Sequence, residues 1–326
     1  MLKKISKLFA AAVVVAVAGA VAGPSSVLAA EHDHDQVPGF YRIKVGELEV
    51  TTLFDGVAVV TPDWLFGAKA TIDNVRSAVQ EVPRLLDAGD AGFLVNTGKH
   101  LILVDTGGGT WFGGGNLGRL ADNLRRSGYE PEKVDRVFVT HLHSDHIGGL
   151  TSKEGKRLFP NAEVYVAKAE SDFWLSPELA AKAPKEVQPF FRDAQAISAP
   201  YIKAGKWHTF SGNESIMEGV RLVGLQGHTP GHTGYEFSSQ GHRILFWGDT
   251  MHSQVVQVSH PEVTVVFDVD QEAARGKRLE LLQTLAHEDV IIAGPHMLFP
   301  SMGRVRSEGA GYIWAPVVYT DKWADR

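Results

Sequence analysis

Residues 141–146 (HLHSDH) contain three histidines and one aspartate within a single short segment. The segment directly follows a strand-like run at residues 136–140 and precedes two glycines. Neutral imidazoles and carboxylates are ligands that borderline cations such as zinc accept readily. A solvated loop or core packing would explain one histidine, but not four ligand-type residues in this spacing. The first two histidines can bind one cation, and the aspartate and last histidine a second: His141, His143, Asp145 and His146.

Three further candidate ligands come later in the chain. His232, Asp249 and His296 each follow an apolar stretch and a glycine-containing turn. The two carboxylate oxygens of Asp249 can bridge two cations and hold them about 3.5–4 Å apart, as in dinuclear hydrolases. Each residue alone is a weak signal, but their order after the first cluster predicts one shared dinuclear site. Asp145 and Asp249 are also expected to act in catalysis by holding a water nucleophile.

The strands that precede the candidate ligands must position them. Each polar cluster comes directly after an apolar stretch, and rigid strand ends hold functional loops in layered α/β proteins. Helical spacing is present at residues 117–128 and 272–285. Alternating or short apolar runs predict strands at residues 41–54 (a pair around a turn at 45–47), 93–96, 101–104, 136–140, 220–225, 235–237, 243–247 and 290–293.

The composition limits the kind of chemistry and the kind of partner. The 326 residues are 44% hydrophobic and 21% charged, which is ordinary for a globular domain, and the formal net charge is −6. A negative charge disfavours a nucleic-acid partner, whose phosphates attract basic surfaces. The chain has no cysteine, so thiolate ligands and a cysteine nucleophile are excluded. Metal ligands must therefore be nitrogen or oxygen atoms.

The N-terminal residues have the pattern of a secretory signal. Lys3, Lys4 and Lys7 precede an apolar run at residues 8–22, which is followed by Gly-Pro and by small residues up to Ala30. A membrane anchor is the alternative, but spanning needs about 20 apolar residues. We therefore expect a signal peptide at residues 1–30, a single hydrolase domain at residues 31–326, and a secreted or periplasmic protein.

Four segments resemble the metallo-β-lactamase superfamily in order and spacing: Thr140–Gly149 (THLHSDHIGG), Gly227–Gly234 (GHTPGHTG), the Gly248–Asp249 pair and the late His296. The resemblance implies a layered α/β fold, the four-layer αβ/βα sandwich, with the metals at one edge of its two central sheets. It assigns one metal to His141, His143 and His232. It assigns the other metal to Asp145, His146 and His296, and both metals share Asp249. By this resemblance His228 orients its loop and is not a ligand.

Further segments look like methyl parathion hydrolase and its lactone- and aryl-ester-cleaving relatives, among them FLVNTG (93–98), AESDFWLS (169–176), YIKAG (201–205), FSGN (210–213) and EGAGY (308–312). This resemblance implies an aromatic pocket over the metals, although core packing would explain each side chain alone: Phe112, Trp174 and Phe190. Three other residues match variable pocket positions of this family: Leu65, His252 and Phe267. A supporting or surface role is the alternative for His252. Aromatic walls suit a flat aryl leaving group.

The sequence thus predicts a hydrolase with two divalent metal ions, zinc first among them, that lower the pKa of a bridging water. Expected substrates are lactones and aryl esters of the dihydrocoumarin type, with phosphotriesters cleaved more weakly. A methyl parathion-type phosphotriesterase, a glyoxalase-type thioesterase and a non-catalytic periplasmic metal-binding protein stay open as alternatives. A class B β-lactamase is disfavoured because those enzymes lack the bridging carboxylate that Asp249 offers. The resemblance also suggests a homodimer, with no membrane contact after signal cleavage.

Overall fold

A computed structural model describes residues 36–112, 115–212, 214–309 and 311–321. The described residues from Pro38 onward form one compact unit. The predicted signal peptide at residues 1–30 and the predicted domain start at residue 31 lie outside the described residues, so both stay predictions. No helix in the described ranges combines the length and the apolar character that a membrane span requires.

The first sheet contains the strands that lead to the HLHSDH segment. Its order is β1-β2-β4-β5-β6-β7-β8. Neighbours from β1 to β5 are antiparallel, whereas those from β5 to β8 are parallel. The predicted strands in this half are confirmed. The bounds are β1 Phe40–Val45, β2 Leu48–Ala58, β4 Ala88–Asn96, β5 Leu101–Val104, β6 Arg136–Phe138, β7 Glu163–Ala167 and β8 Trp207–Phe210.

The second sheet carries the later candidate ligands. Its order is β15-β14-β13-β11-β10-β9, with β11 and β13 parallel and the other neighbours antiparallel. The predicted strands of this half are confirmed, and the β14–β15 hairpin is an addition to them. The bounds are β9 Val220–Gly224, β10 Thr233–Ser239, β11 His242–Phe246, β13 Ile291–Ala293, β14 Met302–Glu308 and β15 Gly311–Pro316, with a separate pair of β3 Leu65–Phe66 and β12 Thr264–Val265.

The helices cover the outer faces of the sheets. The predicted helices correspond to α2 and α8, and α8 begins where the Asp270 carboxylate accepts the Ala273 N–H (3.0 Å). The α-helices are α1 Lys69–Glu81, α2 Leu120–Arg126, α3 Ser144–Ile147, α4 Lys168–Trp174, α5 Pro177–Lys182, α6 Gln188–Lys203, α7 Gln254–Gln257 and α8 Gln271–Leu285. Short 3-10 turns are η1 Pro62–Trp64, η3 Pro131–Lys133, η4 Gly148–Leu150 and η5 Gly248–Thr250.

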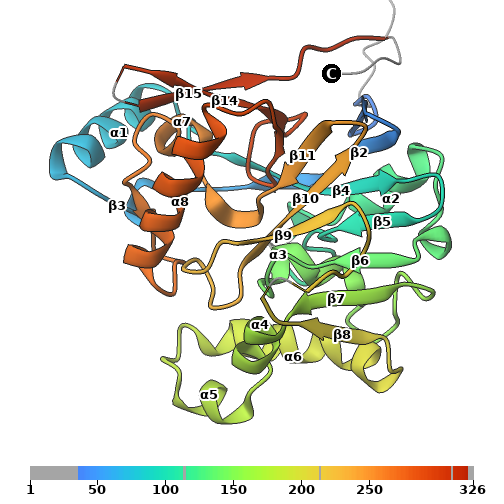
Figure 1. Ribbon diagram of the computed structural model, residues 1–326. Helices are drawn as coiled ribbons and strands as arrows, with labels where there is room; N and C mark the ends of the chain where they lie inside the picture. The colour runs from blue at the N-terminus through green and yellow to red at the C-terminus, as the bar shows by residue number, and fades with distance from the viewer. Residues whose placement is uncertain (1–35, 113–114, 213, 310, 322–326) are drawn as a thin grey trace, which may run out of the picture. The chain divides into compact units, whose positions relative to one another are not determined.

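Three apolar layers hold this arrangement together. Side chains of both sheets meet between them, where Phe93 lies 5.3 Å from Phe246 and Phe138 stacks on Tyr235 at 5.2 Å, measured between ring centroids. Residues of α2, α4 and α6 pack on the outer face of the first sheet. Residues of α8 pack on the outer face of the second sheet, as its position in Figure 1 shows. The predicted four-layer sandwich is confirmed.

The topology brings the candidate ligands to one edge of the molecule. His141 follows the end of β6, Asp249 follows β11 and His296 follows β13. Strands β11 and β13 are parallel, so the loops after them leave the second sheet at the same end. The two sheets face each other across the shared core, so loops from both meet at this edge.

Two glycines allow the HLHSDH segment to pack closely on the loop after β5. A Cβ atom on Gly148 would lie 2.1 Å from the Gly108 oxygen, and one on Gly149 would lie 2.0 Å from the Thr106 oxygen. No larger residue fits such a backbone approach. The contact is closed by the Gly149 N–H, which donates to the Gly107 oxygen (2.9 Å). These contacts fix where the first ligand cluster lies.

The packing of Phe138 between the sheets gives the first prediction. Its ring is fully buried and contacts Tyr165, Tyr235 and Phe237. Phe138→Ala should lower the free energy of unfolding by about 3–5 kcal/mol, since it removes buried area and leaves a cavity. Urea unfolding of the metal-free protein measures this. Val318→Ala, at a side chain that is 74% exposed, is the control and should change stability by less than about 0.5 kcal/mol.

Candidate dinuclear metal centre

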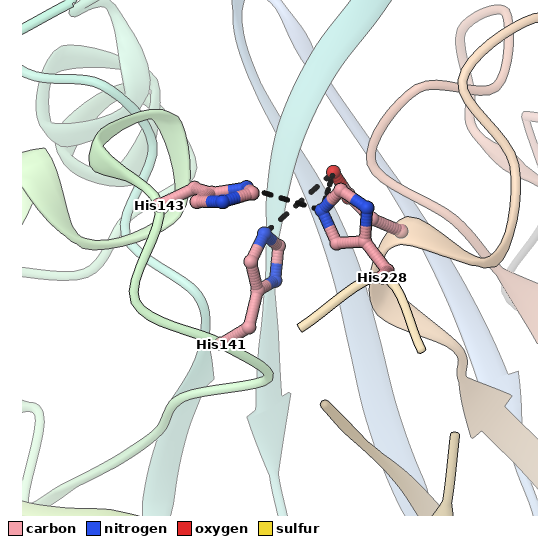
Figure 2. A group of neighbouring side chains, drawn as sticks. His141, His143 and His228 are labelled. Carbon is pink, nitrogen blue, oxygen red and sulfur yellow. Dashed lines mark hydrogen bonds and ion pairs between the residues drawn. The ribbon is translucent and has the colours of Figure 1, made fainter. Parts of the chain in front are cut away.

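Two groups of metal-type ligands lie side by side and share one carboxylate. The first group is His141, His143, His228 and Asp249, and the second is Asp145, His146, Asp249 and His296. Within each group the ligand atoms lie within 4.8 Å of one another. All of these side chains are buried except that of Asp145, which is partly exposed. Figure 2 shows His141, His143 and His228 turned toward a common space.

The distances around Asp249 match the spacing of ligands on a small cation. Its Oδ2 atom lies 3.7 Å from His141 Nε2, 3.3 Å from His228 Nε2 and 3.3 Å from His296 Nε2. Its Oδ1 atom lies 3.0 Å from His146 Nε2. Two ligands bound to a tetrahedral zinc at about 2.1 Å are about 3.4 Å apart. The side chains are therefore spaced as two cations bridged by Asp249 would need.

Several buried nitrogen and oxygen atoms at this place form no hydrogen bond within the described part of the chain, although Nε2 of His146 and Oδ1 of Asp249 lie 3.0 Å apart as an ion pair. They include Nε2 of His141, Nε2 of His146 and Oδ1 of Asp249. Buried polar atoms are nearly always hydrogen-bonded, so these atoms indicate a missing partner. A divalent cation fits, because each of the three atoms can act as a ligand and the donor set holds only nitrogen and oxygen. The residues therefore fit a pair of metal ions.

The electrostatics of the cluster keep some imidazoles neutral and others charged. Burial lowers the pKa of His141 and of His143 well below the ordinary value. For His146, burial also disfavours the charged form, but the carboxylates of Asp249, Asp145 and Asp105 raise its pKa well above the ordinary value. Against the effect of burial, the surrounding histidines hold the pKa of Asp249 well below its ordinary value. The bridging carboxylate is thus ionised and ready to bind cations.

The structure corrects one predicted ligand. His232 was expected to bind metal, but both of its ring nitrogens are used by the backbone. Its Nδ1–H donates to the Leu225 oxygen (3.0 Å), and its Nε2 accepts the N–H of Asp249 (3.0 Å). Burial lowers its pKa to about 3, so the ring is neutral. His232 therefore holds the backbone of Asp249 in place.

His228 takes the place that was predicted for His232. Its Nε2 atom lies 3.1 Å from Nδ1 of His143 and 3.3 Å from the Asp249 carboxylate. The structure places His228, which was predicted only to orient its loop, among the ligand-type side chains of the first group. The two histidines lie in one loop, and backbone contacts of His232 to β9 and β11 decide which of them faces the cluster. The remaining predicted ligands all lie in the two groups.

The second ring nitrogens of the ligand histidines are held by partners outside the cluster. His146 Nδ1 lies 2.9 Å from the Asp105 carboxylate, and His296 Nδ1 lies 3.1 Å from the Gly89 oxygen. Asp105 also accepts the backbone N–H and the hydroxyl of Thr140. Such partners fix the orientation of each imidazole. Asp105 directly follows β5 in the sequence, and that position was a signal that could have revealed it.

Glu170 on α4 connects the two loops that carry ligands of the first group. Its fully buried carboxylate accepts the Leu142 N–H (3.0 Å) and the Gly231 N–H (2.7 Å). Leu142 lies between the ligands His141 and His143, and Gly231 lies in the same loop as His228. Sequence reasoning gave no role to this glutamate. It holds loops from both sheets at a fixed separation.

A cavity of about 410 Å³ opens beside the ligands. Its floor is polar and contains Asp145, Asp249 and the imidazoles, and its walls are apolar. Of the predicted pocket residues, four line it: Phe112, Phe190, His252 and Phe267. Trp64 and Val265 complete the wall opposite Phe190 and were not predicted. The geometry suits a small, largely apolar molecule with one polar group at the ligands.

Two predicted pocket residues lie elsewhere. Leu65 is buried in an apolar cluster with Ile72, Leu86 and Val263 and is not among the residues that line the cavity. Its neighbour Trp64 lines the cavity instead. Trp174 lines a second cavity of about 470 Å³, which shares His143, Phe190 and Phe267 with the first. Its ring meets His143 edge-on at 5.2 Å.

His252 is buried against the bridging carboxylate. Its Nε2 atom lies 3.1 Å from Asp249 Oδ2, and its ring stacks on that of His296 at 5.5 Å between centroids. Burial lowers its pKa, which keeps the imidazole neutral despite the nearby Asp249. The ring also lines the cavity. His252 therefore contributes an uncharged ring to the cavity wall beside the bridging carboxylate.

Known proteins share this sequence pattern. The N-acyl homoserine lactonase of Bacillus sp. is 28% identical over 45% of this chain and 58% of its own length. The hydroxyacylglutathione hydrolase of Aeromonas salmonicida is 26% identical over 49% of this chain and 46% of its own length. The chain thus spans about half the length of the curated relatives it matches.

Solved structures share the fold over most of the chain. The hydrolase AbOPH of the beta lactamase superfamily is 35% identical, with a TM-score of 0.83, over 88% of this chain and 100% of its own. AidC, a dizinc quorum-quenching lactonase solved with the product N-hexanoyl-L-homoserine, is 27% identical, with a TM-score of 0.76 and the same coverage. The family model of the metallo-beta-lactamase superfamily matches residues 86–294. The chain belongs to the metallo-beta-lactamase superfamily.

Proposed function

We propose that the protein is a dinuclear zinc hydrolase of lactones and aryl esters. The observation that carries the proposal is the pair of ligand groups sharing Asp249 at the floor of an apolar cavity. Two lactonases among the similar proteins support the same substrate class. The all-nitrogen-and-oxygen donor set and the dizinc state of AidC support zinc.

The side chains of the cavity have different roles in the proposed ester cleavage. Two bound cations would supply Lewis-acid polarisation of the carbonyl and a water of lowered pKa. Asp145 and Asp249 face the cavity and can accept hydrogen bonds from an attacking water. The neutral imidazole of His252 packs beside Asp249 and forms part of the cavity wall. Phe190 and Phe267 exclude bulk water from the reacting group, which strengthens these interactions.

The lining of the cavity favours this function over two alternatives. Among the described residues that line it there is no Lys or Arg, so apart from the metal site the walls offer no cationic side chain for the carboxylates of a glutathione thioester. A phosphotriester carries no such charge and fits the apolar walls, so phosphotriester cleavage is retained as a weaker activity. A non-catalytic metal-binding protein would have no need for a cavity over its metal ligands.

We further propose that the protein is exported to the periplasm or secreted and that it acts as a homodimer on small molecules. Export is supported by the signal-type pattern of residues 1–30. The close relationship to methyl parathion hydrolase stays a prediction, and it is the source of the homodimer. Sedimentation of the mature protein and analysis of its N-terminus test these two points.

Substrate preference is the first test of the proposed function. For the zinc-loaded mature protein, kcat/KM should be highest for dihydrocoumarin or an acyl-homoserine lactone, lower for methyl paraoxon and lowest for a cephalosporin. The reason is that the apolar cavity accepts a flat or alkyl group beside the ligands. A preference for the phosphotriester would reverse the assignment of the main activity, and a preference for the cephalosporin would overturn the proposal.

The identity of the third histidine ligand is the second test. His228→Ala should lower kcat/KM and the affinity for the first cation by more than about 100-fold, the upper cost of losing a mere outer partner. His208→Ala, at a half-exposed ring paired with Glu163 on the first sheet, is the control and should retain activity. Zinc content after dialysis should fall toward one ion per chain for His228→Ala. Full zinc content and activity in that variant would contradict the proposal.

Metal affinity should depend on pH through two ligand histidines. Burial lowers their pKa, but Asp249 raises it to about 9 in His296, and Asp249 with Asp268 raises it to about 9 in His228. Below that pH both rings are protonated without metal, so binding must release their protons. Zinc affinity should therefore rise with pH between about pH 7 and pH 9. Calorimetry in buffers of different ionisation enthalpy measures the protons released, and a pH-independent affinity would contradict this account.

A further inference from the structure

A buried carboxylate, Asp268, connects a proposed cation ligand to the wall of the cavity. Its side chain has no solvent exposure. Oδ1 accepts a hydrogen bond from Nδ1 of His228 (2.9 Å), and Oδ2 accepts the N–H of Val265 (3.1 Å). Val265 lines the cavity over the ligands, and so does Phe267, which directly precedes Asp268 in the chain. One carboxylate therefore contacts both a proposed cation ligand, His228, and a residue of the cavity wall, Val265.

The negative charge of Asp268 is balanced by a second buried residue. Arg278 on α8 is 1% exposed, and its Nη2 atom lies 3.8 Å from Asp268 Oδ2. Arg278 also donates to the backbone oxygens of Thr250 (2.6 Å), Pro261 (2.9 Å) and Val263 (2.7 Å). Thr250 directly follows the bridging Asp249. The guanidinium thus ties the loops around the cluster to α8 and lies beside the Asp268 carboxylate.

The tautomer of His228 follows from this contact. Because Nδ1 donates to Asp268, Nε2 is the nitrogen left to face His143 and Asp249. His146 is fixed in the same way by Asp105, which lies on the other sheet. Asp268 belongs to neither group that shares Asp249; its ligand-type neighbours are His228 and His252, and its Oδ1 is taken by the Nδ1–H of His228. Its position is therefore that of an outer partner that orients a ligand.

We propose that Asp268 is a positioning residue that fixes His228 for the first cation and couples that cation to the cavity wall at Val265 and Phe267. The proposal rests on the proposed dinuclear function. An amide at this position keeps the size of the side chain, but its single oxygen can serve His228 or Val265, not both. It also leaves Arg278 without its counter-charge. Both effects should loosen the first cation and leave the second group, with His146 and His296, intact.

Cobalt binding separates these effects. Co²⁺ titration of the metal-free protein, followed by its visible absorption, should show two tight equivalents in the parent. Asp268→Asn should weaken one equivalent by about 10–100-fold and shift its absorption, with the other unchanged. Glu236→Gln is the matched control. Glu236, on β10 and away from the cluster, is a buried carboxylate that is paired with Arg221. It should bind both equivalents as the parent does.

Other outcomes decide against one idea or the other. A titration of Asp268→Asn that superimposes on that of the parent overturns the positioning role, even if the metal-free variant unfolds at a lower temperature. If the amide variant does not fold, Asp268→Glu keeps the charge toward Arg278 but displaces the oxygen from His228. That variant should again weaken one equivalent only, and two tight equivalents would overturn the proposal. A parent that binds no Co²⁺ tightly would instead refute the dinuclear function itself.

Discussion

The burial of Asp249 among imidazoles is the constraint on which the structure depends. Removing a carboxylate and several imidazoles from water is costly unless each group finds a partner. Here the side chains partly satisfy one another: Nε2 of His146 and Oδ1 of Asp249 form an ion pair, but neither they nor Nε2 of His141 form a hydrogen bond with any described residue. Two divalent cations would satisfy these atoms together. The cluster is therefore best understood as a site whose full stability requires bound metal.

The two-sheet architecture makes such a cluster possible. The first sheet delivers the HLHSDH segment, and the second delivers the loops with His228, Asp249 and His296. Neither sheet alone completes a ligand group. Each group combines residues of the HLHSDH segment with residues from loops of the second sheet, and Asp249 belongs to both groups. The apolar core between the sheets fixes their separation, and Glu170 connects a loop from each with two hydrogen bonds. Ligand geometry is thus a consequence of core packing.

The outer partners give the site its precision and link it to the substrate cavity. Asp105, the Gly89 oxygen and Asp268 each fix the second nitrogen of a different ligand histidine. They come from separate elements, so the rings are held from several directions. The cavity walls belong to the same elements: β12 and the residues after it carry both the partner of His228 and part of the apolar lining. Changes in the wall can therefore reach the metal ligands.

Much of this could be predicted from the sequence, because local periodicity and spacing specify local structure. The strands before each polar cluster, the helix α8 and the HLHSDH segment are visible in that way. Four predicted residues, Phe112, Phe190, His252 and Phe267, also lie in the cavity wall. The elements β14 and β15 were not anticipated.

The sequence by itself determined the donor types, the strands and the segments that carry the ligands. Tertiary structure alone decided between His228 and His232, which lie four residues apart in one loop. His232 is excluded because the Leu225 oxygen and the Asp249 N–H, from other elements, occupy its nitrogens. The placement of Leu65 in a separate core cluster follows from the pairing of β3 with β12. Such contacts join residues far apart in the chain, and no local pattern encodes them.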